Sequence, residues 1–274
     1  MTGSSGYSAP AVAGSGAIAL GLAASATTLG AVRLLARSEG SAEKATAKAA
    51  KLCGKIDGAD ESRLEVLTEV GALADCDLIV EAIVEDREAK LELYVRLAAA
   101  CPNADLATTT SSLLIADLGE AAGVADRFYG LHVFNPVAKM ELVELCIPAA
   151  LRDGAADRAR AFCAALGKRA IEVPDQTGFV VNRLLFPYLF DAVRLQESSG
   201  MTAEDVDACM SLGAGHPMGP LALIDFVGLD VAIAIGESLA AESGDPAHQP
   251  PPRLRELAAE GTLGRKSGAG FFNY

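Results

Sequence analysis

Short apolar runs alternate with helical patterns along the first two thirds of the chain. The runs typical of buried strands cover residues 9–13, 32–36, 77–84, 105–110, 127–134, 142–146 and 169–173. Amphipathic segments at 41–55 and 86–99 are predicted to be helices. Because strands alternate with helices, we predict an α/β fold around a mostly parallel sheet.

After about residue 174 the apolar positions follow a helical period. The predicted helices cover residues 178–196, 202–213, 221–227, 231–242 and 253–260. Pro187 predicts a kink in the first of these helices, and Thr202 begins a capping box at the start of the second. We therefore predict an α/β domain at 1–175 and a smaller all-helical domain at 176–274. The apolar surface of so few helices favours a homodimer formed through this second domain.

A glycine motif lies between the first two predicted strands. Residues 14–19 read GSGAIA, which matches the G-x-G-x-x-A pattern of dinucleotide-binding turns. Gly14 allows the tight turn, Gly16 leaves room for a pyrophosphate, and Ala19 lets the helix approach the strand. The N–H groups of the helix start, at Ala17 and Ile18, offer donors to phosphate. A packing turn that binds nothing is the alternative that the motif alone leaves open.

The residues that close the second strand favour one form of the cofactor. NAD sites usually place an acid here to hold the ribose 2′-hydroxyl, whereas this chain has Arg37 and Ser38. A guanidinium can pair with a 2′-phosphate and a serine can donate a hydrogen bond to it. We therefore expect NAD(P) as the cofactor, with NADP(H) favoured over NAD(H). The alternative is an arginine that is solvated or stacks on the adenine without discriminating.

The segment 130–144, GLHVFNPVAKMELVE, contains a candidate proton acceptor. His132 ends an apolar run, and Glu144 follows twelve positions later. A histidine near neutral pKa and an acid that orients it suit the oxidation of an alcohol to a ketone. A core histidine and an unrelated surface acid are the alternative. Strand ends favour the functional reading, because Gly14, Arg37, Glu85, Ser111 and His132 all fall at carboxyl ends of predicted strands, where such sheets bind ligands.

Composition excludes several classes of protein. The chain has 274 residues, of which 51% are hydrophobic and 22% charged, and its net charge is −13. This balance indicates a globular protein and argues against a nucleic-acid partner. The six cysteines form no C-x-x-C pair, so we expect no metal site and reduced thiols in the cytoplasm. Residues 1–32 are uncharged but rich in Gly, Ala, Ser and Thr, so we expect neither a signal peptide nor a membrane span.

Seven segments along the chain form a pattern, and they read GSGAIALGLA, DLIVEAIVED, TTTSSLLI, FYGLHVFNPVAKMELVE, DQTGFVVNRLL, GAGHPMGPLALIDFVGLD and LGRKSGAGFFNY. Together they resemble the 3-hydroxyacyl-CoA dehydrogenase family, including bacterial 3-hydroxybutyryl-CoA dehydrogenases. The resemblance implies a Rossmann-like dinucleotide-binding domain at 1–175, a helical domain for substrate binding and dimerisation at 176–274, and reversible hydride transfer at C3 of a 3-hydroxyacyl thioester. It implies that His132 is the general base, that Glu144 orients it, that Ser111 hydrogen-bonds the reacting oxygen and that Asn182 helps to hold the substrate. The positions that resemble cofactor contacts are Glu85, Lys90, Asn135 and Lys266.

Three departures from the family pattern keep alternatives open. Arg37 replaces the ribose-binding aspartate, Thr109 stands where asparagine is usual, and the segment 37–77 is short for the helical hairpin that contacts CoA. The thioester is therefore carried either by CoA or by an acyl carrier protein. A silent dinucleotide-binding protein is a further alternative, which the intact set of four site residues disfavours. A dehydrogenase of free β-hydroxyacids would need a lysine base in the region where this chain has Asn182. The nearest lysine is Lys168, so this alternative is disfavoured.

Overall fold

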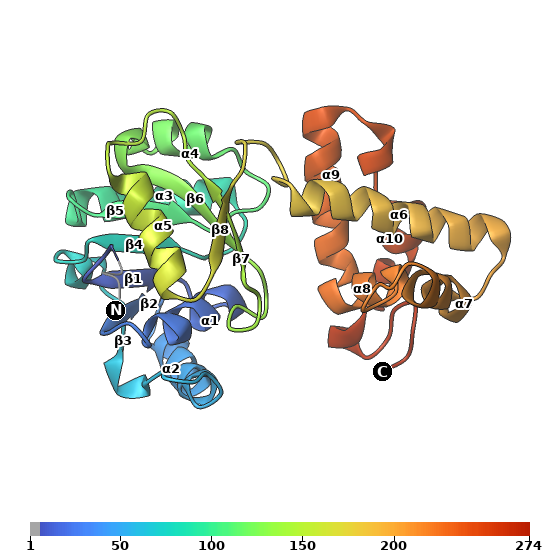
Figure 1. The fold of residues 1–274 in the computed structure, drawn as a ribbon, viewed down its shortest axis with the longest axis horizontal. Coiled ribbons are helices and arrows are strands. Elements are labelled where there is room, and N and C mark those ends of the chain that lie inside the picture. Colours follow the sequence, from blue (N-terminus) through green and yellow to red (C-terminus); the bar gives the residue numbers. More distant parts are fainter. Residues whose placement is uncertain (1–5) are drawn as a thin grey trace. The chain divides into compact units, whose positions relative to one another are not determined.

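The computed structural model describes residues 6–274 and divides the chain into two compact units, Met1–Gln176 and Thr177–Tyr274. In the first unit a sheet is surrounded by helices, and the second unit is helical (Figure 1). Within the described residues, eight strands form one sheet in the order β3-β2-β1-β4-β5-β6-β7-β8. The α/β class predicted from the alternating pattern is confirmed.

The strands are short, and all but the two edge strands β3 and β8 are almost entirely buried. They are β1 (Pro10–Ala13), β2 (Val32–Leu35), β3 (Leu64–Leu67), β4 (Leu78–Glu81), β5 (Asp105–Thr108), β6 (Phe128–Val133), β7 (Leu142–Cys146) and β8 (Arg169–Glu172). Strands β1 to β6 run parallel to one another, whereas β7 pairs antiparallel with β6 and β8 runs parallel to β7. Strand order reverses between β1 and β4, which is where ligands enter sheets of this type.

Helices connect the strands of the first unit. They are α1 (Ala17–Ala26), α2 (Glu39–Cys53), α3 (Arg87–Ala100), α4 (Ile115–Ala121) and α5 (Ala155–Ala165), with short 3₁₀ turns η1 (Glu61–Arg63), η2 (Val70–Leu73) and η3 (Ala125–Arg127). One hydrophobic core joins side chains of α1, α2 and α5 to the strands, including Leu22, Ala45 and Phe162. The predicted helices at 41–55 and 86–99 match α2 and α3, with ends shifted by one or two residues.

Besides the 3₁₀ turns, three elements of the first unit were not predicted. Strand β3 lies within the segment 37–77, for which no strand was predicted, and it is a half-exposed strand at the edge of the sheet. Helices α4 and α5 were missed because they are short and rich in alanine, which weakens the apolar period. None of the three changes the fold class.

The second unit contains α6 (Val181–Ser199), α7 (Ala203–Ala208), α8 (Pro220–Val227), α9 (Leu229–Ser243) and α10 (Pro252–Ala259), together with η4 (Cys209–Gly213), η5 (Pro246–His248) and η6 (Arg265–Ser267). Pro187 lies inside α6, and the Thr202 side chain accepts a hydrogen bond from the Asp205 N–H at the start of α7, as the capping box predicts. A core around Phe186, Phe190 and Ile224 holds the helices together. No described helix has the length and apolarity needed to cross a membrane.

Candidate active site

Five predicted site residues lie along one edge of the sheet. Gly14 follows β1, Arg37 follows β2, Glu85 follows β4, Ser111 follows β5, and His132 is the penultimate residue of β6. These five strands are parallel and adjacent, so their carboxyl ends share one edge. The sheet therefore brings together residues that are spread over more than a hundred positions of the chain.

The glycine motif forms a close turn against the neighbouring strand. Gly14 has φ 137°, and its N–H donates to the Leu35 carbonyl at 2.9 Å. A Cβ at Gly14 would lie 2.3 Å from the Ala82 carbonyl oxygen, so a side chain does not fit. A Cβ at Gly16 would meet no atom within 4 Å. The turn therefore requires Gly14 for packing, while the space beside Gly16 is open to a ligand.

The start of α1 provides the donors for an anion. Gly16 is the N-cap, and no side chain caps it. The backbone N–H groups of Ala17, Ile18 and Ala19 donate no hydrogen bond to any described residue, and the first turn contains no acid. Unsatisfied N–H groups and the helix dipole favour a phosphate at this position. The open space at Gly16 and this donor set fit the pyrophosphate of a dinucleotide.

The end of β2 carries an exposed cation. Arg37 is exposed and makes no hydrogen bond or ion pair within residues 6–274. Ser38 is the N-cap of α2, where its Oγ accepts from the Ser41 N–H at 3.4 Å and lies 3.0 Å from the Ser41 hydroxyl. The nearest acid, Glu39, accepts a hydrogen bond from the Thr68 hydroxyl at 2.7 Å. The guanidinium is thus available to a ligand.

His132 and Glu144 form a pair across two antiparallel strands. They are register partners on β6 and β7, and His132 Nδ1 lies 2.7 Å from a Glu144 carboxylate oxygen. Glu144 is 1% exposed and His132 is 8% exposed, with the Phe134 ring packed edge-on at 4.6 Å. Because a carboxylate oxygen can only accept, Nδ1 carries the proton and Nε2 is the basic atom of the ring. This is the arrangement of an oriented general base.

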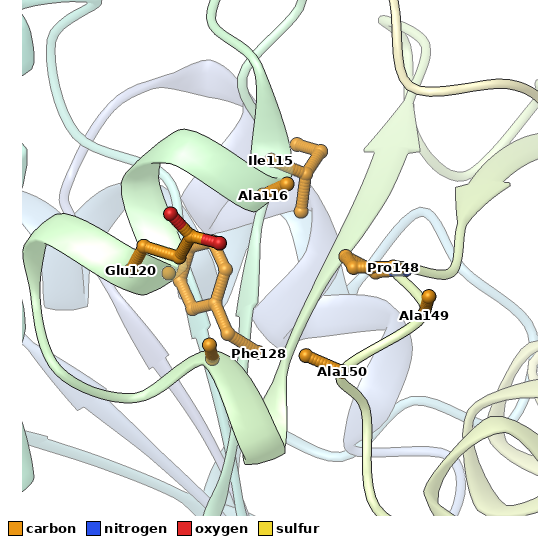
Figure 2. Close-up of a pocket in the computed structure, with 9 residues that line it drawn as sticks. Ile115, Ala116, Glu120, Phe128, Pro148, Ala149 and Ala150 are labelled. Atoms are coloured by element: carbon orange, nitrogen blue, oxygen red, sulfur yellow. The ribbon is translucent and has the colours of Figure 1, made fainter.

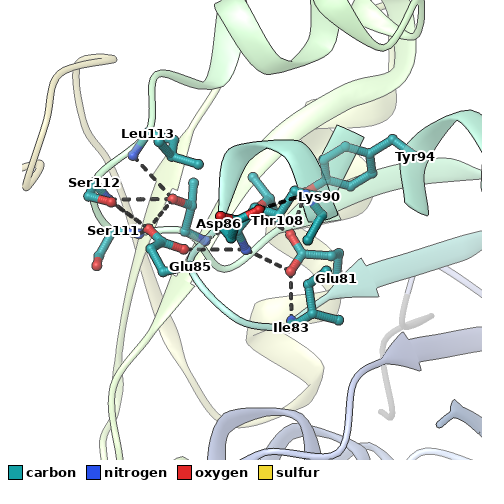
Figure 3. Close-up of polar contacts among 12 residues, drawn as sticks. Glu81, Ile83, Glu85, Asp86, Lys90, Tyr94, Thr108, Ser111, Ser112 and Leu113 are labelled. Atoms are coloured by element: carbon teal, nitrogen blue, oxygen red, sulfur yellow. Dashed lines mark hydrogen bonds and ion pairs between the residues drawn. The ribbon is translucent and has the colours of Figure 1, made fainter. Parts of the chain in front are cut away.

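Glu85 anchors the loop that carries Ser111. One Glu85 oxygen accepts from the Ser111 N–H at 3.1 Å, from the N–H and hydroxyl of Ser112 at 3.1 and 2.7 Å, and from the Thr110 hydroxyl (Figure 3). Burial raises the pKa of Glu85, but the Lys90 charge and these hydrogen bonds outweigh burial and hold the pKa below its ordinary value of 4.5. The Ser111 hydroxyl itself donates to no described residue, so it is available to a substrate oxygen.

Lys90 is the site position whose surroundings differ most from expectation. The sequence places it on an exposed-looking helix, but its side chain is 1% exposed. Its ammonium lies 2.7 Å from a Glu81 oxygen and 3.3 Å from a Glu85 oxygen. Asn135, in contrast, is exposed just after β6 and precedes Pro136 through a cis peptide bond.

Two predicted site residues belong to the second unit. Asn182 is the second residue of α6 and is 8% exposed, and its side-chain amide has no hydrogen bond to a described residue. Lys266 lies in η6, where its ammonium forms an ion pair with Asp230. The ion pair lowers the pKa of Asp230 against the opposing effect of burial. The amide of Asn182 is therefore available for a ligand, whereas the Lys266 ammonium already has a partner.

One pocket of about 200 Å³ lies away from these residues (Figure 2). It is lined by α4, by Phe128 at the start of β6 and by residues 148–150. His132 lies at the other end of β6, and Glu120 is the one charged residue in the lining. The pocket therefore holds none of the predicted chemistry.

A parallel sheet with a glycine turn at β1 and an oriented histidine at β6 defines a dinucleotide-dependent oxidoreductase. The model of the 3-hydroxyacyl-CoA dehydrogenase NAD binding domain matches residues 10–176, and that of the C-terminal domain of the same enzymes matches residues 178–274. The chain therefore belongs to the 3-hydroxyacyl-CoA dehydrogenase family, as the sequence resemblance predicted.

Individual relatives agree over most of the chain. Mitochondrial hydroxyacyl-coenzyme A dehydrogenase of Homo sapiens is 40% identical over 252 residues, which are 88% of this chain and 80% of the relative. A 3-hydroxybutyryl-CoA dehydrogenase of Mycobacterium tuberculosis is 40% identical over 81% of this chain and 80% of its own. The crystal structure of M. tuberculosis FadB2 superposes with a TM-score of 0.92 at 36% identity, covering 97% of this chain and 98% of that one. That of (S)-3-hydroxybutyryl-CoA dehydrogenase PaaH1 from Ralstonia eutropha gives 0.90 at 33% identity, with the same coverage.

Proposed function

We propose that this chain is an NAD(P)-dependent dehydrogenase that interconverts 3-hydroxyacyl-CoA and 3-oxoacyl-CoA. The observation that carries the proposal is the buried His132–Glu144 pair, which lies at the same sheet edge as the open glycine turn. The family models and the names of the relatives support CoA as the carrier.

The chemistry that we propose uses the chain's own groups as follows. His132 Nε2 takes the proton of the 3-hydroxyl group, and the Glu144 carboxylate stabilises the imidazolium that results. The Ser111 hydroxyl donates a hydrogen bond to the same oxygen, which steadies the charge that develops there. A nicotinamide bound beside these residues would supply the acceptor for the hydride that leaves C3. In the reverse direction His132 returns the proton to the oxygen of the ketone.

We propose that residues 1–175 bind the dinucleotide and that 176–274 contribute to substrate binding and dimerisation. The pyrophosphate would lie on the N–H groups of residues 16–19, with Glu85 and Asn135 at the same sheet edge. Asn182 would hold the substrate through its side-chain amide, as the resemblance implies. All six cysteines, which lie within the described residues, are free thiols, and this supports a cytoplasmic location.

We further propose that NADP(H) is preferred over NAD(H). The end of β2 carries Arg37 in place of the acid that is usual in NAD sites, and this side chain has no partner among the described residues. The Ser38 and Ser41 hydroxyls lie beside it at the start of α2. These groups suit a 2′-phosphate, because a guanidinium and hydroxyl donors bind dianions well. The carboxylate of Glu39 is already bonded to Thr68.

Turnover with a CoA thioester tests the proposed function directly. We expect the purified protein to oxidise NADPH when acetoacetyl-CoA is added, measured as the loss of absorbance at the nicotinamide band. An acetoacetyl thioester on an acyl carrier protein is the comparison substrate, because the short segment after α2 left the carrier open. A higher kcat/KM with the carrier protein would contradict CoA as the carrier, and inactivity with both thioesters and both cofactors would contradict the function.

A homodimer is expected to form through the second unit. Leu184 and Leu195 on α6 are 71% and 53% exposed. They are eleven positions apart, which is about three helical turns, so they lie on the same face of the helix. Burying this face between two copies removes apolar area from water. We expect sedimentation to give a dimer for the wild type and a shift toward monomer for Leu184→Glu combined with Leu195→Glu. Glu197→Lys, on another face of α6, is the matched control and should stay dimeric. A monomeric wild type would contradict the proposal.

A further inference from the structure

Three charged side chains, Glu81, Lys90 and Glu85, contact one another in sequence beside the Ser111 loop, which comprises residues 109–114. The first of them, Glu81 at the end of β4, is 0% exposed. Glu81 accepts from the Ile83 N–H at 2.7 Å, from the Thr108 hydroxyl at 2.8 Å and from the Tyr94 hydroxyl. Burial and the adjacent carboxylate raise the pKa of Tyr94 well above its ordinary value, so this hydroxyl keeps its proton and donates. Glu81 is therefore fixed from three sides.

Lys90 connects this fixed carboxylate to the loop. Its ammonium contacts both Glu81 and Glu85, and the opposite oxygen of Glu85 accepts from Thr110, Ser111 and Ser112 (Figure 3). Two carboxylates share one buried cation, so each group limits where the next one can lie. The Ser111 hydroxyl takes no part in these bonds and is the group that the loop presents outward.

We infer that Glu81, Lys90 and Glu85 are positioning residues, which act on the reaction by fixing the place of the Ser111 hydroxyl. This inference rests on the role proposed above for Ser111 at the reacting oxygen. It differs from the cofactor contacts that the resemblance implies for Glu85 and Lys90, because the Lys90 ammonium contacts two carboxylates and Glu85 accepts mainly from donors of the Ser111 loop. The geometry is suited to this function, since a donor that is misplaced by about 1 Å can lose on the order of 10²-fold in rate.

A double-mutant cycle separates this role from a direct cofactor contact. Glu85→Ala is expected to lower kcat about tenfold, because the loop loses its common acceptor, while KM for the dinucleotide stays within about twofold. In a Ser111→Ala background, the same change is expected to cost less than about twofold, since its effect passes through Ser111. Additive losses, or a raised dinucleotide KM with unchanged kcat, would overturn the inference.

Hydrogen exchange provides a readout that does not depend on turnover. The Ser111 and Ser112 N–H groups both donate to Glu85, so Glu85→Ala should speed exchange in residues 109–114. Glu88→Gln is the matched control, because this carboxylate is 81% exposed and its one ion pair among residues 6–274 is with Arg87. Equal exchange in the wild type, the control and Glu85→Ala would overturn the inference.

Lys90→Met tests the link to Glu81. It should speed the same exchange and lower kcat to a similar extent as Glu85→Ala, because Glu85 loses its cation. If Lys90→Met does not fold, Glu85→Gln carries the test, since it keeps the size of the side chain and removes the charge that faces Lys90. A Glu85→Gln protein with wild-type exchange and wild-type kcat would overturn the inference. Loss of the positioning effect leaves the dependence on His132 intact, whereas failure of the proposed function would show as a His132 variant with full turnover.

Discussion

Replacing His132 with alanine is expected to lower kcat by roughly 10²–10⁴-fold, the usual contribution of a general base. The imidazole is the acceptor for the 3-hydroxyl proton, and Glu144 at 2.7 Å fixes the tautomer in which Nε2 is basic. Dinucleotide binding should change little, because its proposed contacts lie on β1, β2 and the start of α1. Initial rates with NADPH and acetoacetyl-CoA measure kcat, and fluorescence titration measures cofactor binding.

Two companion variants make the His132 result specific. Glu144→Gln keeps the shape of the side chain, but its amide can donate to Nδ1 and favour the wrong tautomer, so kcat should also fall strongly. His216→Ala removes a histidine of the second unit that contacts the Tyr188 hydroxyl at 3.2 Å, and kcat should stay near the wild-type value. Full turnover in His132→Ala would show that another group is the base.

The placement of His132 opposite Glu144 could be predicted from the sequence. Apolar runs at 127–134 and 142–146 predict two strands, and the short connection between them favours an antiparallel pair. In that arrangement His132 and Glu144 can be register partners, which the structure shows. The position of Ser111 at a strand end followed from the same reasoning, because parallel strands share their carboxyl edge.

The charged groups beneath Ser111 could not be predicted. Glu81 lies inside the run DLIVEAIV and reads as one polar residue of a strand, and Lys90 reads as a solvated residue of a helix. Their burial depends on the contact between α3 and the end of β4, where Lys90 and Tyr94 bond to Glu81, and this tertiary contact has no local sequence signal. A lysine that is 1% exposed is rare unless it is paired, and its partners are separated from it along the chain by five and nine residues.

The edge strand that pairs with β2 could not be predicted from the sequence either. Strand β3 has four residues, LEVL, of which none is fully buried, so its alternation gives a weak strand signal. It pairs with β2 in parallel and thereby fixes the end of β2 from which Arg37 extends. The cofactor prediction made from Arg37 and Ser38 therefore depends on a region whose framework the sequence did not reveal.

Arg37→Asp is expected to reverse the preference between the two cofactors. In the wild type we expect kcat/KM to be higher with NADPH, because a free guanidinium meets the 2′-phosphate. Hydrogen bonds to charged groups contribute about 1.5–3 kcal/mol, and each 1.4 kcal/mol is about a tenfold change. Loss of the guanidinium should therefore lower kcat/KM for NADPH by about 10- to 100-fold, and the new carboxylate adds repulsion of the phosphate while it can accept from a ribose hydroxyl of NADH.

A charge reversal elsewhere on the same segment distinguishes a local contact from a general field effect. Lys51 lies in the last turn of α2, exposed and without an ion pair in the described part of the chain. Lys51→Asp changes the net charge by the same amount as Arg37→Asp, but the ratio of the two kcat/KM values should stay within about twofold, because salt screens charges beyond about 10 Å. Equal shifts in both variants would indicate long-range electrostatics, and a wild type that prefers NADH would show that Arg37 does not select the phosphate. A local effect confined to Arg37 would make the end of β2 the determinant of cofactor choice, separate from the His132–Glu144 chemistry at the end of β6.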